Sequence, residues 1–276
     1  MNLQVPEFIR FGREICGDLE QAERREWWLA NGLGAYAAGT IAGTLTRCYH
    51  GLLIAPINPP LGRYLVFAKA DAVLLDGDRE WPLATNRWRD GAVDPQGYLH
   101  IESFRLEGRM PVWTYAFGDL RLEMRIWMEP GANTTYVAYR LRSAASARPV
   151  PQLRVRLLIN ARDHHATTQP WSLNPIIEHD PTHLKVVHPN WFDLHFKCCT
   201  GSFRGEHSWI ENFSLSVERH RGLHDVDNHL CVGEALLDLS EGQWTGLVAS
   251  LDEDATSDVV EAMRRFRARD AGVLTR

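Results

Sequence analysis

Residues 120–128 of this chain read LRLEMRIWM. Every even-numbered position in this stretch is apolar, and three of the four positions between them carry a charge. Successive side chains of a strand point to opposite faces of the sheet, so a period of two residues indicates a strand with one face on a core. The stretch therefore predicts a half-buried β-strand.

The same alternation recurs on both sides of this stretch. It runs through residues 99–107, 112–117, 135–141, 153–160 and 191–197, and turn sequences such as Asp94-Pro95-Gln96-Gly97 and Glu129-Pro130-Gly131 separate the segments. Apolar runs at 64–68 and 73–75 are typical of strands buried on both faces. Strands over roughly 250 residues exceed one immunoglobulin-type domain, so we expect an all-β fold, a large antiparallel two-sheet sandwich.

One convincing helix follows the strands near the end of the sequence. Asp258 can cap it, with Glu261 three residues later as the second member of a capping box. Val259, Met263 and Phe266 then fall on one side at helical spacing, and Gly272 is expected to end the helix. The prediction is an all-β unit with a short C-terminal helix.

Composition excludes several classes of protein. The chain has 276 residues, 45% of them hydrophobic, and a formal net charge of −5. It is too apolar for a disordered protein and has no apolar run long enough to cross a membrane. No signal peptide is recognisable at the start, and no basic stripe interleaved with aromatic residues suggests nucleic acid. We expect a cytoplasmic protein with neither membrane nor nucleic acid as a partner.

The cysteines suggest neither a disulfide framework nor a zinc site. There are five of them, without any C-x-x-C spacing. The adjacent pair Cys198 and Cys199 ends an alternating segment and is interpreted as packing rather than redox chemistry.

Several standard catalytic motifs are absent. Residues 34–40 (GAYAAGT) have the outline of a phosphate loop but lack its lysine, and residues 201–205 (GSFRG) have the serine one place too early for a nucleophile elbow. The histidines are scattered, and Pro181 separates His179 from His183. We therefore expect no cofactor and no metal site.

The N-terminal third contains a distinctive block rich in glycine. Residues 31–40 read NGLGAYAAGT and residues 46–55 read TRCYHGLLIA. The glycines allow tight turns, and Arg47, Tyr49 and His50 place polar groups and an aromatic ring beside an apolar strand. The block is consistent with a polar ligand site and equally with a rigid structural junction.

These segments resemble a known family. The block just quoted, RDHH at residues 162–165, and WIENFSLSVERHRGL at residues 209–223 with DVDNHLCVGEALLDLSEGQW after it are similar to the N-terminal domain of bacterial and archaeal glycogen-debranching enzymes. The matches extend in the right order over residues 26–255. Cys48 stands where that family commonly has a second arginine.

The resemblance implies an architecture and a function. It implies a β-supersandwich over residues 1–255 and a helix over 256–276 that leads to an (α/α) toroid catalytic domain. The family hydrolyses α-1,6-glucosidic branch points of glycogen, and its two catalytic carboxylates belong to the toroid. We therefore expect no catalytic residue in this chain, which would be an accessory domain that shapes the glycan cleft and packs on the toroid, in cis or in trans. Its other partner would be an α-glucan, glycogen or limit dextrin.

Contacts with sugar require aromatic faces and polar groups. Trp88, Trp171, Trp191 and Trp209 lie in polar, loop-like surroundings and are candidate stacking platforms, whereas Trp113 and Trp127 are expected to pack between the sheets. Further candidates for substrate or domain contact come from the quoted motifs; they are Asn31, Arg47, Tyr49, His50, Arg162, Asp163 and His165.

Two other functions compete with this hypothesis. One is a free-standing α-glucan-binding module that needs no catalytic partner. The other is a sugar mutarotase or epimerase, in which His164 or His165 would act with Glu178 as general acid and base. A purely structural alternative is that Asp163 and its neighbouring histidines form a buried polar network.

Overall fold

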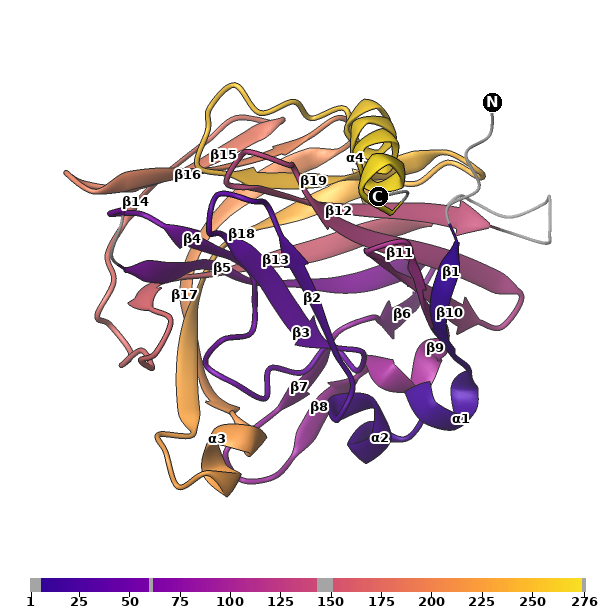
Figure 1. Ribbon diagram of the computed structural model, residues 1–276, viewed down its shortest axis with the longest axis horizontal. Helices are drawn as coiled ribbons and strands as arrows, with labels where there is room; N and C mark the ends of the chain where they lie inside the picture. Colours follow the sequence, from indigo (N-terminus) through magenta and orange to yellow (C-terminus); the bar gives the residue numbers. More distant parts are fainter. Residues whose placement is uncertain (1–5, 60–61, 143–150, 275–276) are drawn as a thin grey trace.

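The chain folds into two large antiparallel sheets packed face to face, as shown by a computed structural model that describes residues 6–59, 62–142 and 151–274 (Figure 1). The nine-stranded sheet has the order β1 (Glu7–Phe11), β9 (Ile101–Glu107), β10 (Met110–Phe117), β11 (Leu120–Met128), β12 (Thr134–Arg142), β19 (Trp244–Ser250), β16 (Phe192–Cys198), β15 (His183–His188) and β14 (Ile176–His179). The prediction of an all-β two-sheet sandwich is confirmed.

The second large sheet carries most of the remaining strands. Its order is β17 (Ser202–Ser214), β18 (Val226–Asp238), β13 (Gln152–Asp163), β5 (Arg63–Asp76), β4 (Gly51–Pro56), β3 (Tyr36–Thr40) and β2 (Glu26–Ala30), with β6 (Arg79–Pro82) paired to β5. A small ribbon joins β7 (Thr85–Arg87) and β8 (Val93–Gln96). The helices are α1 (Arg13–Cys16), α2 (Leu19–Glu23), the 3₁₀ turn η1 (Gly97–His100), α3 (Ser216–His220) and α4 (Val259–Leu274).

The alternating stretch that predicted a strand is β11, with the predicted ends. It lies between β10 and β12, and Leu122 pairs with Leu141 of β12. Its inward side chains join one large core between the sheets, to which both sheets contribute. Trp27 meets Trp113 edge to face there, and Phe67 meets Phe196 across the two sheets.

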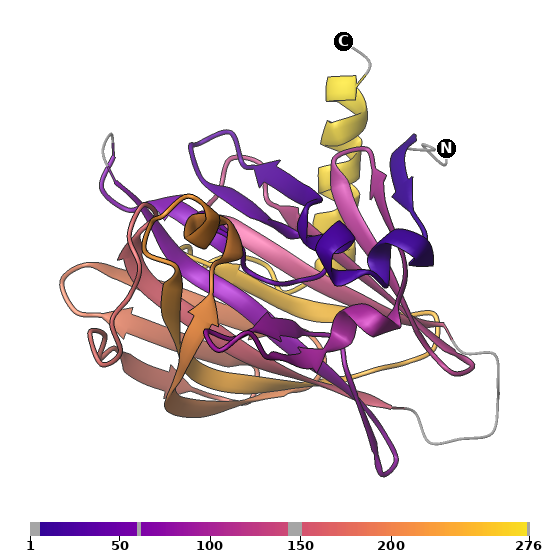
Figure 2. The same ribbon diagram turned by 90° about the horizontal axis from the view of Figure 1, so that it is seen from below.

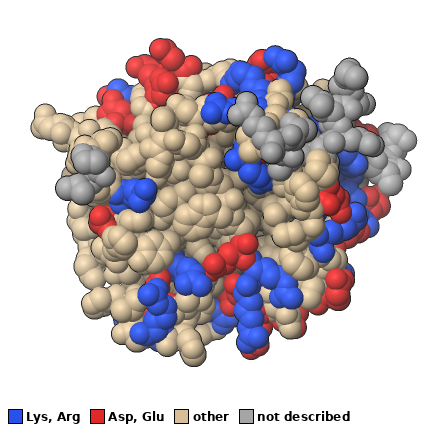
Figure 3. Space-filling view, viewed as in Figure 1, with Lys and Arg blue, Asp and Glu red and all other residues tan. Residues whose placement is uncertain are grey.

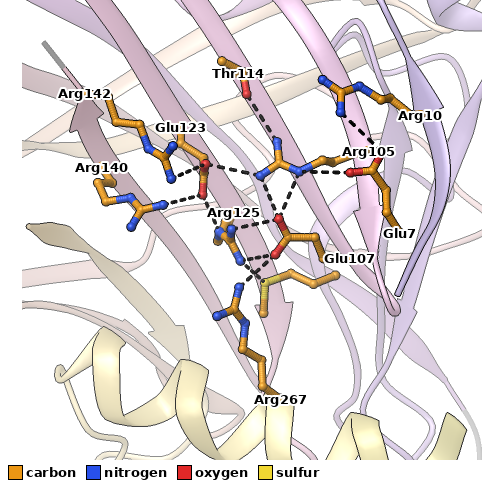
Figure 4. A network of polar contacts seen from close by, with 11 residues as sticks. Glu7, Arg10, Arg105, Glu107, Thr114, Glu123, Arg125, Arg140, Arg142 and Arg267 are labelled. Carbon is orange, nitrogen blue, oxygen red and sulfur yellow. Dashed lines mark hydrogen bonds and ion pairs between the residues drawn. The ribbon is translucent and has the colours of Figure 1, made fainter. Parts of the chain in front are cut away.

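The charged side of β11 is buried too, which the alternation does not reveal. Glu123 and Arg125 are both almost fully buried on the outer face of the nine-stranded sheet and bond to each other at 2.7 Å. Arg125 also donates to Glu107 on β9, and Glu107 accepts a further bond from Arg267 on α4 (Figure 4). A buried charge is costly unless it is paired, and here the guanidinium groups of Arg105, Arg125 and Arg267 are paired with the carboxylates of Glu107 and Glu123.

Helix α4 packs on another part of this outer face. Its residues Val259, Met263 and Phe266 pack on a second apolar cluster that contains Trp127. Trp127 therefore lies between β11 and α4 rather than between the sheets, whereas Trp113 lies in the central core as predicted. Figures 1 and 2 show α4 on the same side of the molecule as β1.

The ends of α4 differ in part from the prediction. Asp258 caps the helix, because its Oδ1 accepts the backbone N–H groups of Val260 and Glu261, each at 3.0 Å. Glu261 does not complete a capping box; its carboxylate pairs with Arg264 one turn later. Gly272 does not end the helix, which continues to Leu274.

Several strand boundaries also differ from the prediction. The segment predicted to begin at residue 99 begins at Ile101, because residues 97–100 form a 3₁₀ turn. The two apolar runs at 64–68 and 73–75 belong to one long strand, β5. The segment predicted to end at residue 160 extends to Asp163, which brings Arg162 and Asp163 to the end of β13. No helix in the described part of the chain is long and apolar enough to cross a membrane.

Candidate functional site

The three segments that carry the family resemblance meet at the outer face of the eight-stranded sheet. Arg162, at the end of β13, donates from Nη2 to the carbonyl oxygen of Cys48 at 2.8 Å and from Nε to Asp227 of β18 at 2.9 Å. Asp227 is fully buried, and Arg162 nearly so. The guanidinium group therefore holds the loop before β4 against the sheet through a charge-assisted contact.

A second buried carboxylate holds the same loop from the other side. Glu218, on α3, accepts the backbone N–H of Cys48 at 3.1 Å and an Nη1–H of Arg221 at 3.1 Å. Burial, together with Glu218, raises the pKa of the Cys48 thiol to about 12, so the thiol stays protonated near neutral pH. In Figure 2, α3 lies in front of the strands.

Beside this junction lies a set of rings that we call the aromatic cluster: Trp28, Tyr36, Tyr49, His164 and His165. Trp28 stacks on Tyr36 with 4.3 Å between ring centroids. The Tyr36 hydroxyl bonds to Nδ1 of His164 at 2.8 Å, and the Tyr49 hydroxyl bonds to Nδ1 of His165 at 2.9 Å. The side chains come from β2, β3, the loop before β4 and the loop after β13, so the cluster depends on the order of these strands in the sheet.

The aromatic cluster is exposed at Trp28 and at His165, and its middle is enclosed, because Tyr36 is buried and His164 is half-buried. Trp28 is 58% exposed, although it is one of the largest apolar side chains in the chain. Burial raises the pKa of Tyr36, and burial followed by the neighbouring His165 lowers the pKa of His164. Over β2 and β3 the surface shows few charged side chains in Figure 3, and charges gather below it toward α2 and α3. Such a face suits an uncharged ligand with apolar faces and hydroxyl groups.

Trp28 is a candidate site residue that sequence reasoning missed. The sequence Glu26-Trp27-Trp28-Leu29-Ala30 alternates, and burial follows it: Trp27 and Leu29 are buried, while Trp28 shares the exposed face with Glu26. That alternation is the signal in the sequence that distinguishes the exposed Trp28 from the buried Trp27.

Asn31 and His50 have structural roles. The Asn31 side chain is 3% exposed; its amide nitrogen donates to Ala132 and Asn133, and its oxygen accepts from Leu33 and Ala35. Asn31 thereby joins the β2–β3 turn to the β11–β12 turn.

His50 is 2% exposed and accepts the backbone N–H of Thr46 at 3.1 Å. Its other nitrogen lies 3.3 Å from Glu26, which also pairs with Arg47 at 2.6 Å. The contact with His50 lowers the pKa of Glu26 to about 2; Arg47 acts in the same direction, and burial acts against both. Arg47 itself remains about one third exposed.

Two of the four candidate tryptophans are exposed, and the other two are half-buried. Trp171 is 74% exposed and lies 6.3 Å from the ring of Trp209, and Trp191 is 38% exposed and packs edge to face on Tyr64. Trp209 is half-buried. Trp88 is also half-buried, and its indole N–H donates to the carbonyl oxygen of Asp94 at 2.8 Å. Trp171 and Trp191 therefore offer more free ring surface than the other two.

The structure does contain a buried polar network, but it joins β13, β18 and the loop after β13 and leaves Asp163 and the two histidines outside it. Asn160, Thr168, Asp227, Asn228 and His229 are buried and bond to one another, whereas Asp163 and His164 are half-buried and His165 is exposed. Burial lowers the pKa of His229 to about 4. The network anchors the start of the loop that follows β13.

Glu178 lies apart from the histidines with which it could have formed an acid–base pair. It is exposed on β14, at the edge of the nine-stranded sheet, whereas His164 and His165 follow β13 of the other sheet. No hydrogen bond or ion pair joins them within the described residues.

The comparison with known protein families agrees with the quoted motifs. The family described as "Glycogen debranching enzyme N terminal" matches residues 25–245. No curated protein matches the chain. Among solved structures, a bacterial glucoamylase complexed with acarbose is similar, with 10% sequence identity, a TM-score of 0.38, and coverage of 86% of this chain and 35% of that one. The chain thus spans about a third of the length of that solved chain. By the family match over residues 25–245, the chain belongs to the glycogen-debranching-enzyme N-terminal domain family.

Proposed function

We propose that this domain is the non-catalytic N-terminal part of a glycogen-debranching glycoside hydrolase, and that the aromatic cluster forms one wall of its glycan cleft. Residues 1–255 would be the β domain, and residues 256–276 would lead to an (α/α) toroid catalytic domain. The observation that carries the proposal is the exposed ring of Trp28, stacked on Tyr36 among the segments that define the family.

The chemistry of the aromatic cluster supports a neutral sugar as the ligand. A pyranose ring presents an apolar face that stacks on an indole, and its hydroxyl groups need donors and acceptors at the rim. Tyr49, His164 and His165 offer such groups within the same cluster.

The test compares two exposed aromatic residues in the debranching enzyme that contains this domain. Trp28→Ala should raise KM for limit dextrin about tenfold and leave kcat within about twofold, because a stacking contact is worth roughly 1.4 kcal/mol. Phe8→Ala is the matched control, because Phe8 is also 58% exposed but lies on β1 of the other sheet. Equal KM values for both variants and the unmodified enzyme would refute the role of the cluster.

The absence of catalysis in the isolated chain is a separate test. The purified 276-residue chain should release no glucose from branched dextrin above the rate of a buffer blank, because the catalytic carboxylates are proposed to belong to the toroid. Measurable release that is abolished by a substitution in this chain would contradict that assignment.

A free-standing α-glucan-binding module is the second candidate, and the same exposed Trp28 ring favours it. Isothermal titration of the isolated chain with maltoheptaose separates the two functions. Saturable binding by the chain alone supports a module, whereas binding only in the presence of the catalytic domain supports a shared cleft.

A further inference from the structure

We propose that Asp163, His164 and His165 bind a divalent transition-metal ion of the Zn²⁺ class. Asp163 is the last residue of β13 and the two histidines follow it, and one ligand atom of each residue lies within 4.8 Å of the others. The proposal goes beyond the glycan cleft and does not depend on it.

The backbone holds the three residues in a compact turn. The N–H of His164 donates to the carbonyl oxygen of Arg63 on β5 at 2.9 Å. The N–H of His165 donates to Oδ1 of Asp163 at 2.8 Å, and the N–H of Ala166 donates to the Asp163 carbonyl oxygen at 3.0 Å. The backbone of the turn is therefore tied both to the sheet and to the Asp163 side chain.

Tyrosine hydroxyls orient both imidazole rings. Nδ1 of His164 faces the hydroxyl of Tyr36, and Nδ1 of His165 faces the hydroxyl of Tyr49. If each Nδ1–H donates to its tyrosine oxygen, each Nε2 presents a lone pair, and no described residue bonds to either Nε2. Metal-bound histidines commonly use their second nitrogen in this way, which fixes the ring and the tautomer.

The donor set selects the class of metal. Two imidazoles and one carboxylate suit Zn²⁺, Co²⁺ or Ni²⁺, whereas Mg²⁺ and Ca²⁺ prefer oxygen donors alone. Ligand atoms of a tetrahedral zinc site lie roughly 3.4 Å apart, so small side-chain rotations would close the present spacing. His165 is exposed, and the neighbouring charge of Arg162 is already paired with Asp227.

Three protein ligands leave at least one coordination position open. His165 lies on the solvent side of the turn, so water or a ligand hydroxyl could take that position. The site would therefore be a ligand-accessible one rather than a closed structural one.

Isothermal titration of the untagged, chelator-treated chain with ZnCl₂ tests the proposal. We expect one saturable site per chain, with an affinity at least tenfold weaker in the His164→Ala/His165→Ala double variant. His220→Ala/His224→Ala is the matched control, because it removes two exposed histidines on and after α3 and should bind like the unmodified chain. Tyr49→Phe, which removes the hydroxyl beside His165, should weaken binding about tenfold.

Two further measurements keep the outcome unambiguous. His165→Ala alone removes only an exposed side chain, so it should weaken binding even if the double variant is unfolded by circular dichroism. Visible absorption of the Co²⁺ form should appear with the unmodified chain and disappear with His165→Ala. Unchanged zinc affinity in His165→Ala, absence of saturable zinc binding, or preference for Mg²⁺ would overturn the proposal, and none of these results bears on the KM test of Trp28.

Discussion

At the scale of single residues, the loop before β4 depends on groups far away in the sequence. Glu218 accepts the N–H of Cys48 across 170 residues, and Arg162 reaches the Cys48 carbonyl across 114 residues. The backbone N–H and the carbonyl oxygen of Cys48 are thus both satisfied by buried charged side chains. Breaking such a contact leaves an unpaired buried group, which costs more than the contact itself contributes.

Glu218→Ala should therefore destabilise the fold by about 3 kcal/mol. The carboxylate is almost fully buried, and its removal leaves the N–H of Cys48 without a partner. Urea unfolding measures the loss. Arg219→Ala on the same helix is the control, because its ion pair with Asp225 is partly exposed and should be worth less than about 1 kcal/mol. Equal losses in the two variants would contradict the proposed contribution of Glu218.

Buried histidines make stability depend on pH at the residue scale. Burial lowers the pKa values of His188 and His229 to about 4 from an ordinary value of 6.5. Between those pH values the unfolded chain binds protons that the folded chain does not, so stability falls as pH falls from 6.5 toward 4. Each histidine contributes a loss of about 3 kcal/mol over that range.

His188→Phe should flatten this dependence. Phenylalanine keeps the ring that packs 4.5 Å from Phe192 and removes the titrating group, including an Nε2 that has no hydrogen-bond partner among the described residues. Free energies of unfolding measured at pH 7 and pH 5 should differ less in the variant than in the unmodified chain. An unchanged difference would show that His188 does not titrate with the proposed shift.

At the scale of elements, α4 is attached to the nine-stranded sheet by both apolar and charged contacts. Phe266 packs on the cluster around Trp127, and Arg267 beside it pairs with Glu107 of β9. Phe266→Ala should cost about 3 to 4 kcal/mol, because it opens a cavity under the helix. Val260→Ala on the exposed side of the same helix should stay within about 0.5 kcal/mol. Chemical unfolding measures the loss of stability in both variants. A loss in Val260→Ala as large as that in Phe266→Ala would contradict the packing of α4 on the sheet through Phe266.

The elements that the sequence predicts well are those in which one repeat runs without interruption. Residues 120–128 form a strand with the predicted ends, because their register has no bulge on either side. Strand β17 has register shifts between Gly205 and Ser208 and between Ile210 and Phe213, which break the period of two. The alternation also cannot tell that Glu123 and Arg125 are buried, since α4 and the pairing of charges cover them only in the folded chain.

At the scale of the whole molecule, the candidate site is formed by contacts that no local pattern specifies. Tyr36 and His164 are 128 residues apart, and Tyr49 and His165 are 116 residues apart. The motifs identify the segments, and sheet order brings β3, β4, β5 and β13 side by side. Burial then separates the roles: His50 and Asn31 are enclosed, and Trp28 is left on the surface.

Because both sheets contribute to one central core, the domain should unfold as a single cooperative unit. Phe67 of β5 and Phe196 of β16 meet across the sheets at 4.9 Å between centroids, so Phe67→Ala removes an inter-sheet contact and should cost about 3 to 5 kcal/mol. Its urea midpoint should move equally by tryptophan fluorescence and by far-ultraviolet circular dichroism. Phe8→Ala, on the exposed side of β1, should leave both midpoints almost in place. If the two probes separated in Phe67→Ala, the sheets would be unfolding independently, and the central core could not be the common support of the aromatic cluster and α4.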